Sequence, residues 1–69
     1  MALDAVIDAL HTGGAAFRVE SNTADGTLRV SIGNTVEWLA ENSALANAAA
    51  AEAVLREQAA IHFPAVVLP

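Results

Sequence analysis

Residues 17–32, FRVESNTADGTLRVSI, are expected to form the β-hairpin around which the rest of the chain packs. Apolar and polar side chains alternate on both sides of Asp25-Gly26, and a period of two residues indicates half-buried strands. Two registers are open: a two-residue Asp-Gly turn, or a four-residue loop over residues 23–26 with Gly26 left-handed. We favour the loop, because it matches apolar with apolar and acid with base across the strands. The pairs are then Phe17 with Ile32, Val19 with Val30, and Glu20 with Arg29.

An amphipathic helix is predicted before this β-hairpin. Leu3, Val6, Ile7 and Leu10 follow the i, i+3, i+4, i+7 spacing of one apolar helix face. The glycine pair at residues 13–14 supplies a left-handed stop. We expect a helix over residues 2–11. Its apolar face should cover the apolar face of the hairpin, since a two-stranded sheet is marginal alone.

A second helix is predicted directly after the hairpin, over residues 34–42. Asn34 and Glu37 are spaced as in a capping box. Val36, Leu39 and Ala40 would face inward. Trp38 lies one position off that apolar stripe.

A third helix is predicted over residues 44–62. One helix from 34 to 62 would be about 42 Å long, too long for a domain of this size, so we expect a break. Ser43 is a good N-cap and is our first choice for that break, with Asn47 second. Pro64 ends the helix. The tail, residues 65–69, either pairs with a hairpin edge as a short third strand or frays.

These elements predict a single α+β domain over residues 1–69. The order is helix, β-hairpin, then one broken or two consecutive helices (αββαα), with the short C-terminal strand left open. Alanine supplies 17 residues, which add little buried area to a small core. We therefore expect self-association as a homodimer, through the alanine face of the third helix or the tail.

Charge and composition limit the classes of partner that the chain can bind. The net charge is −5, with three arginines and no lysine, which works against direct nucleic-acid contact. This balance suits a protein partner or serves solubility. The chain has no cysteine and no apolar run near the ~20 residues of a membrane span. We expect a cytoplasmic protein without membrane contact.

No constellation indicates catalysis. Asp4, Asp8 and His11 share one face of the first helix and fit a solvated polar surface. His62 fits a cation at a helix end. The glycine pair precedes a strand, so it is not a phosphate loop. We expect no enzyme, no catalytic residue, no metal, no cofactor and no small-molecule substrate.

The expected function is binding another protein. Trp38 either anchors an interface or seals the edge of the core. Arg18 and Arg29 on the polar hairpin face are either solvated or receive an acidic partner segment. The free hairpin edge over residues 28–32 would accept a partner strand. The candidate partner-binding residues are Arg18, Leu28, Arg29, Val30, Ser31, Ile32 and Trp38.

The order of features over residues 3–32 resembles the TubC-type β-hairpin docking domains at the N-termini of nonribosomal peptide synthetase and hybrid polyketide synthase subunits. In them a short helix, a glycine, an x-V-E strand, a turn and an L-R-V strand precede one or two helices. The matching residues are Leu3, Ile7, Leu10, Gly14, Phe17, Val19, Glu20, Leu28, Arg29 and Val30. The resemblance implies that a partner's C-terminal segment adds to the hairpin edge, with Arg18 and Arg29 reading its charge.

Two other functions stay open. One is a small acidic phage or mobile-element inhibitor that binds and blocks a nucleic-acid-binding protein complex. Such a decoy would depend on its acidic side chains and on low salt. Those side chains are Asp4, Asp8, Glu37, Glu41, Glu52 and Glu57. The other is an oligomerisation module whose dimer seam is the alanine face.

Overall fold

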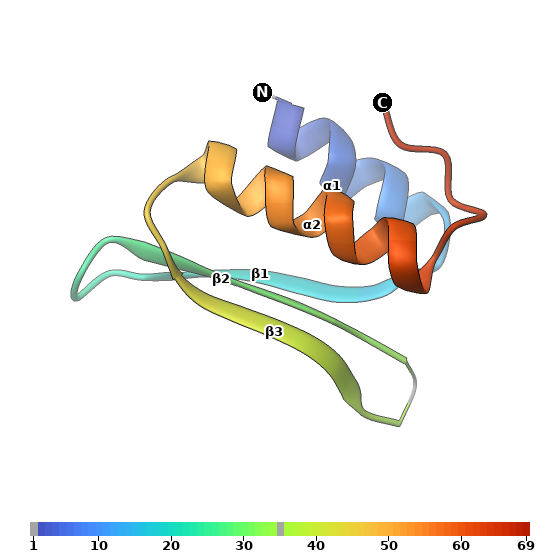
Figure 1. Ribbon diagram of the computed structural model, residues 1–69. Helices are drawn as coiled ribbons and strands as arrows, with labels where there is room; N and C mark the ends of the chain where they lie inside the picture. The colour runs from blue at the N-terminus through green and yellow to red at the C-terminus, as the bar shows by residue number, and fades with distance from the viewer. Residues whose placement is uncertain (1, 35) are drawn as a thin grey trace.

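The fold is a two-layer α+β sandwich of one sheet and two helices. The structure is a computed structural model that describes residues 2–34 and 36–69. Its elements are α1 (Ala2–Thr12), β1 (Ala16–Asn22), β2 (Thr27–Gly33), β3 (Trp38–Leu45) and α2 (Ala48–His62). The strands form an antiparallel sheet in the order β1-β2-β3, and both helices lie on one face of it (Figure 1). The predicted α+β class is confirmed.

Helix α1 is where its apolar spacing predicts it. Leu3, Val6 and Leu10 are buried. Gly14 has a φ of 74°, the left-handed conformation that glycine adopts without strain. The Ala15 N–H donates to the Leu10 carbonyl (3.0 Å) and closes the last turn.

The hairpin has the predicted four-residue loop and register. Phe17 pairs with Ile32, Val19 with Val30, and Glu20 with Arg29. Gly26 has a φ of 74°, and its N–H donates to the Asn22 carbonyl (2.8 Å). The Asp25 carboxylate accepts from the Thr27 hydroxyl (2.7 Å) and the Thr27 N–H (3.0 Å). Those bonds favour the ionised carboxylate, so the pKa of Asp25 lies below its ordinary value.

The prediction of a helix over residues 34–42 is wrong: residues 38–42 belong to strand β3, and Asn34, Val36 and Glu37 before it are not helical. Thr35 lies outside the described residues. Asn34 Oδ1 does accept from the Val36 and Glu37 N–H groups (2.8 Å each). The Asn34 N–H also donates to the Glu37 carbonyl (2.9 Å), which turns the chain back. An Asn side chain makes such bonds in an Asx turn as well as in a helix cap. The third strand gives β2 a second neighbour and relieves the marginal two-stranded sheet.

Strand β3 is irregular at both ends. Its register with β2 shifts between Leu28 and Val30 and again between Ile32 and Gly33. Ala44 lies at the first shift with a φ of 62°, which is unfavourable for a residue with a Cβ. These shifts break the alternation of apolar and polar residues that would have marked a strand in the sequence.

Helix α2 begins four residues later than predicted. Ser43, the first choice for its N-cap, lies inside β3, so that choice was wrong. Asn47, the second choice, is the N-cap, and its Oδ1 accepts from the Ala50 N–H (2.9 Å). The helix ends at His62, directly before Phe63 and Pro64, as predicted.

The tail adds no strand to the sheet: residues 65–69, all within the described part of the chain, are not extended strand. Residues 65–69 instead lie on the helix layer, where Val66 and Leu68 pack against the core. A Cβ on Gly13 would come within 2.8 Å of Val66 Cγ2, so the tail fits closely against the end of α1. Arg56 Nη1 donates to the Pro69 carbonyl.

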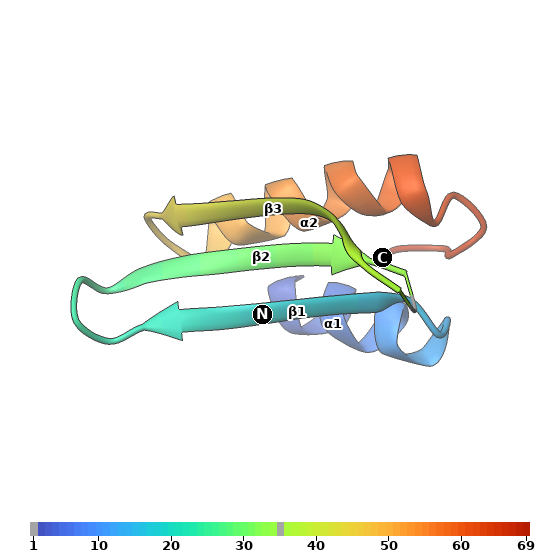
Figure 2. The same cartoon turned by 90° about the horizontal axis from the view of Figure 1, so that it is seen from below.

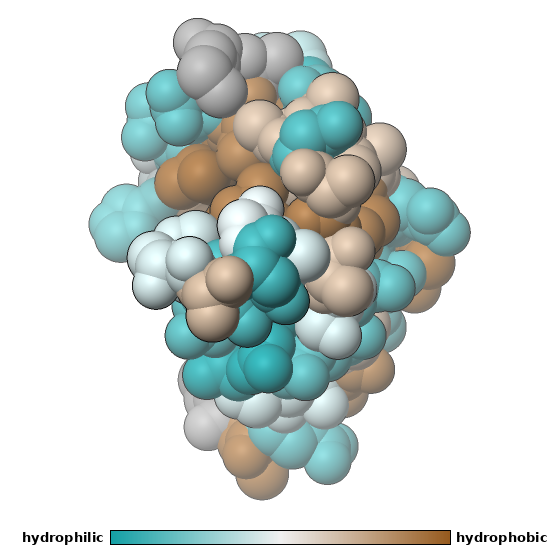
Figure 3. Space-filling model, turned by 90° about the vertical axis from the view of Figure 1, so that its left-hand side faces the viewer, coloured by the Kyte–Doolittle hydropathy of each residue, from teal (hydrophilic) through white to brown (hydrophobic). Residues whose placement is uncertain are grey.

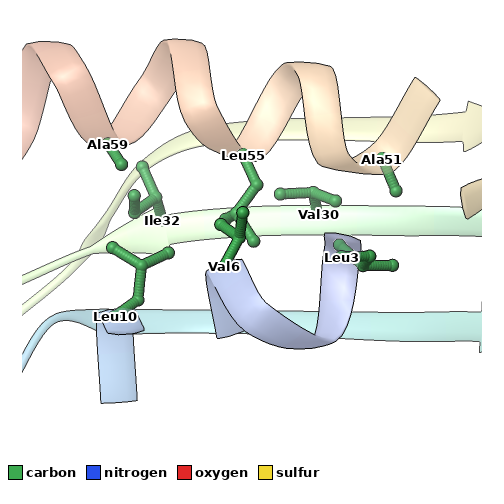
Figure 4. Packing of buried hydrophobic residues seen from close by; sticks show 8 residues of the cluster. All are labelled: Leu3, Val6, Leu10, Val30, Ile32, Ala51, Leu55 and Ala59. Atoms are coloured by element: carbon green, nitrogen blue, oxygen red, sulfur yellow. The ribbon is translucent and has the colours of Figure 1, made fainter. Parts of the chain in front are cut away.

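The core lies between the sheet and both helices (Figure 4). Its buried residues come from α1, β2 and α2, and those of α2 recur every fourth residue. They are Leu3, Val6, Leu10, Val30, Ile32, Ala51, Leu55 and Ala59. The two alanines let α2 approach the sheet closely. From the hairpin end, hydrophobic atoms are visible above the polar tip of the hairpin (Figure 3).

Candidate functional site

The candidate site is the open face of the sheet, the face turned away from both helices (Figure 2). Successive side chains of a strand point to opposite faces, so the neighbours of the buried Val30 and Ile32 point outward. The ladder then aligns Arg18 with Ser31 and Ser31 with Glu41 across the three strands. The open-face residues are Arg18, Glu20, Arg29, Ser31, Trp38 and Glu41.

The charges of the open face neutralise one another. Arg18 Nε lies 3.0 Å from Glu20 Oε1, and Arg18 Nη2 lies 3.5 Å from Glu41 Oε2. Arg29 Nε lies 4.0 Å from Glu41 Oε1. The Arg18–Glu20 contact is an ion pair without hydrogen-bond alignment, because Nε has no hydrogen-bond partner. These side chains are 40–50% exposed, so the pairs position groups more than they stabilise the fold.

Trp38 lies on this face and outside the core. Its Cε3 is 2.9 Å from where a Cβ on Gly33 would be, so the indole rests against the glycine backbone. The Arg18 guanidinium carbon is 4.5 Å from the ring centroid, within cation–π range. The residue is still 46% exposed. Trp38 is therefore held in place and available, and it does not seal the core.

Ser31 forms the floor of the open face. It is fully buried, and its hydroxyl donates to Glu41 Oε2 (3.4 Å), a long hydrogen bond. A small side chain here leaves room for Arg18 and Glu41 to meet above it.

The structure places the seven predicted binding residues on two different faces of the sheet. It brings Arg18, Arg29 and Trp38 together on the open face, with Ser31 beneath them. Val30 and Ile32 are each 1% exposed in the core, so neither can line a surface. Leu28 is partly buried and packs against the core from the helix side of the sheet, away from the open face.

The free hairpin edge expected over residues 28–32 is also wrong. Strand β2 is paired with β1 on one side and with β3 on the other. The chain supplies its own third strand at the position where a partner strand was expected. The free edges of the described sheet are the outer sides of β1 and β3.

The predicted list of binding residues omitted two members of the open face. The hairpin pattern already pairs Glu20 with Arg29 across the strands, as the structure shows, but Glu20 was not named as a binding residue. Glu41 lies in the segment that was predicted to be a helix, and only the pairing of β3 with β2 places it beside Arg18. Val36, two residues before Trp38, and Leu39, directly after it, are exposed apolar residues.

The rest of the described surface shows weaker candidates for a functional site. The described residues hold no group of three metal-ligating side chains. An open polar hollow of about 480 Å³ lies near the hairpin tip, lined among others by Asn22, Asp25 and Ser43. Within residues 2–34 and 36–69, no helix is both long and apolar enough to cross a bilayer. Comparisons of the chain with protein-family models, curated proteins and solved structures found no match.

Proposed function

We propose that this chain is a non-catalytic protein-interaction module that binds another protein through the open face around Trp38. One observation carries the proposal: a half-exposed tryptophan is fixed between a glycine backbone and an arginine, away from the core. Tryptophan and arginine are the residues most enriched at binding hot spots. An aromatic ring that is already held loses little conformational entropy when a partner covers it.

The chemistry of the face indicates the kind of partner. An apolar side chain of the partner would rest on Trp38, and an acidic one would compete with Glu20 and Glu41 for Arg18 and Arg29. This mode replaces the strand addition at residues 28–32, because β3 occupies that edge. The chain has no cysteine, which is compatible with the cytoplasm as the compartment.

The test compares two variants as bait in extracts of the source cells. Trp38→Ala removes the proposed anchor, and Ile61→Ser changes an exposed apolar residue of α2 as the control. A partner captured by the wild type is purified, and its affinity for each chain is measured by calorimetry. We expect Trp38→Ala to lose about 10- to 100-fold in affinity and Ile61→Ser to lose none. Equal affinities for all three chains would contradict the proposal, provided circular dichroism shows each one folded.

A second candidate, the acidic inhibitor of a nucleic-acid-binding complex, rests on a different observation. Four acids lie exposed and outside the ion pairs found in the described part of the chain: Asp4, Asp8, Glu37 and Glu57. Glu41 and Glu52, which were also expected to serve, are paired with arginines. Binding through the free acids should weaken steeply with salt. If this function is correct, neutralising those four acids should abolish binding of the complex, whereas Trp38→Ala should not change it.

A further inference from the structure

The outer edge of β1 is regular and unprotected. Strand β1 pairs with β2 over seven successive positions without a register shift. On its other side the described chain places no strand. The strand, AFRVESN, has no proline, lysine or bulge, the features that usually keep an edge from pairing with another chain. Its outward N–H and C=O groups therefore form a straight template.

The other edge of the sheet differs. Strand β3 carries two register shifts, and Ala44 has a positive φ at one of them. A bulged strand bends and turns its backbone groups out of one row. The fold thus blunts the β3 edge and leaves the β1 edge open.

The sequence of β1 is complementary to itself in one register. In an antiparallel pair of two β1 strands centred on Val19, Arg18 of each copy lies opposite Glu20 of the other. Opposite charges directly across strands are favourable. A pair centred on Arg18 would set two arginines opposite each other, and one centred on Glu20 would set two glutamates. Charge therefore selects the Val19 register.

Burial at this edge fits the same pairing. Phe17 and Val19 face the helix layer and are only half-buried in the single chain. In the Val19 register the two Val19 side chains would lie opposite each other, and each Phe17 would lie opposite Ser21. The second copy would cover apolar surface that α1 leaves partly exposed.

We propose that two copies of this chain form a two-fold dimer by pairing their β1 strands antiparallel about Val19. Each copy contributes three strands, so the dimer has one continuous sheet of six. Pairing in this register keeps the faces aligned, so all four helices lie on one side and both open faces on the other. The dimer would present two Trp38 surfaces in one plane, which goes beyond the proposed function and does not depend on it.

The decisive experiment uses two charge variants of the full chain. Arg18→Glu places acids at both positions, and Glu20→Arg places arginines at both. A dimer of either variant alone has two cross-strand pairs of like charge. A mixed dimer, with one copy of each variant, has two cross-strand pairs of acid with arginine. Sedimentation equilibrium from about 1 μM to about 1 mM should show a wild-type dimer, about tenfold weaker association for each variant, and recovery on mixing.

A second measurement covers the case in which a charge variant folds poorly. The chain has no cysteine, so Val19→Cys and Ser21→Cys each introduce a unique thiol. Only Cβ atoms directly opposite each other come close enough for a disulfide. Under mild oxidation Val19→Cys should form a covalent dimer and Ser21→Cys should not.

Three outcomes would overturn the dimer: a wild-type monomer throughout that concentration range, a mixture that associates no better than its components, or equal cross-linking at both positions. Trp38→Ala keeps β1 intact and should dimerise like the wild type. A failed dimer with Trp38-dependent partner binding would refute only this inference. A dimer without such binding would refute only the proposed function.

Discussion

Replacing Gly33 with alanine should destabilise the fold and displace Trp38. A Cβ at this position would lie 2.5 Å from the Glu37 carbonyl oxygen and 2.9 Å from Trp38 Cε3. The carbonyl cannot yield freely, because it accepts the Asn34 N–H bond that closes the β2–β3 turn. Overpacking of this kind costs about 1–3 kcal/mol, and loss of that hydrogen bond adds about 1 kcal/mol.

An opposing effect reduces this cost. Alanine restricts the unfolded chain, which returns about 0.5–1 kcal/mol. The net loss should be about 1–3 kcal/mol. A domain of this length has a free energy of unfolding of roughly 3–10 kcal/mol, so the loss is a large part of it. Urea denaturation followed by circular dichroism measures the free energy of unfolding. The fluorescence of Trp38, the single tryptophan, reports its surroundings.

Gly26→Ala is the matched control. A Cβ there meets nothing within 4 Å, but the φ of 74° makes alanine unfavourable. This variant should lose about 1 kcal/mol through backbone strain alone, with unchanged Trp38 emission. If Gly33→Ala were as stable as the wild type and its emission were unchanged, the close approach of β3 and Trp38 to Gly33 would be refuted.

Three further predictions concern local interactions. Ala44→Gly should stabilise the fold by about 0.5–1 kcal/mol in urea denaturation, because glycine relieves the positive φ at some entropic cost; destabilisation would contradict the bulge. Asn47→Ala should cost about 0.5–2 kcal/mol in the same assay, and Asn47→Asp should retain most of the cap; equal losses would contradict it. Thr27→Val should raise the pKa of Asp25 toward its ordinary value, as measured by NMR titration. The Asp25 contribution to stability is present above the ordinary pKa and lost as pH falls through the lowered one, so Thr27→Val should reduce acid sensitivity; an unchanged Asp25 titration would contradict the assignment.

Local patterns sufficed for the parts of the fold that depend on local interactions. The spacing of Leu3, Val6 and Leu10 predicts α1, and cross-strand matching predicts the hairpin register without knowledge of the helices. The Asn47 cap also follows from local chemistry, but Ser43 was ranked ahead of it in the sequence. Local reasoning ranked these two caps wrongly because it gave residues 38–45 to helices.

Strand β3 could not be predicted because its signal is tertiary. Two register shifts break its alternation of apolar and polar residues, and Asn34 makes the same side-chain bonds in a turn as in a helix cap. What selects the strand is the unpaired edge of β2, which no local pattern reports. The candidate site could therefore be predicted only in part. The hairpin pattern places Arg18 and Arg29 on one face, but Trp38 and Glu41 lie beside them only because β3 pairs with β2.

An NMR measurement of backbone contacts in the isolated chain tests directly whether β3 carries Trp38 onto the open face. We expect cross-strand nuclear Overhauser effects that pair Ser31 with Glu41 and Ile32 with Ala40. The α-protons of Gly33 should be shifted by the Trp38 ring current. Helical contacts between residues three apart over residues 36–42, without those cross-strand effects, would contradict the fold and remove the surface on which the proposed function depends.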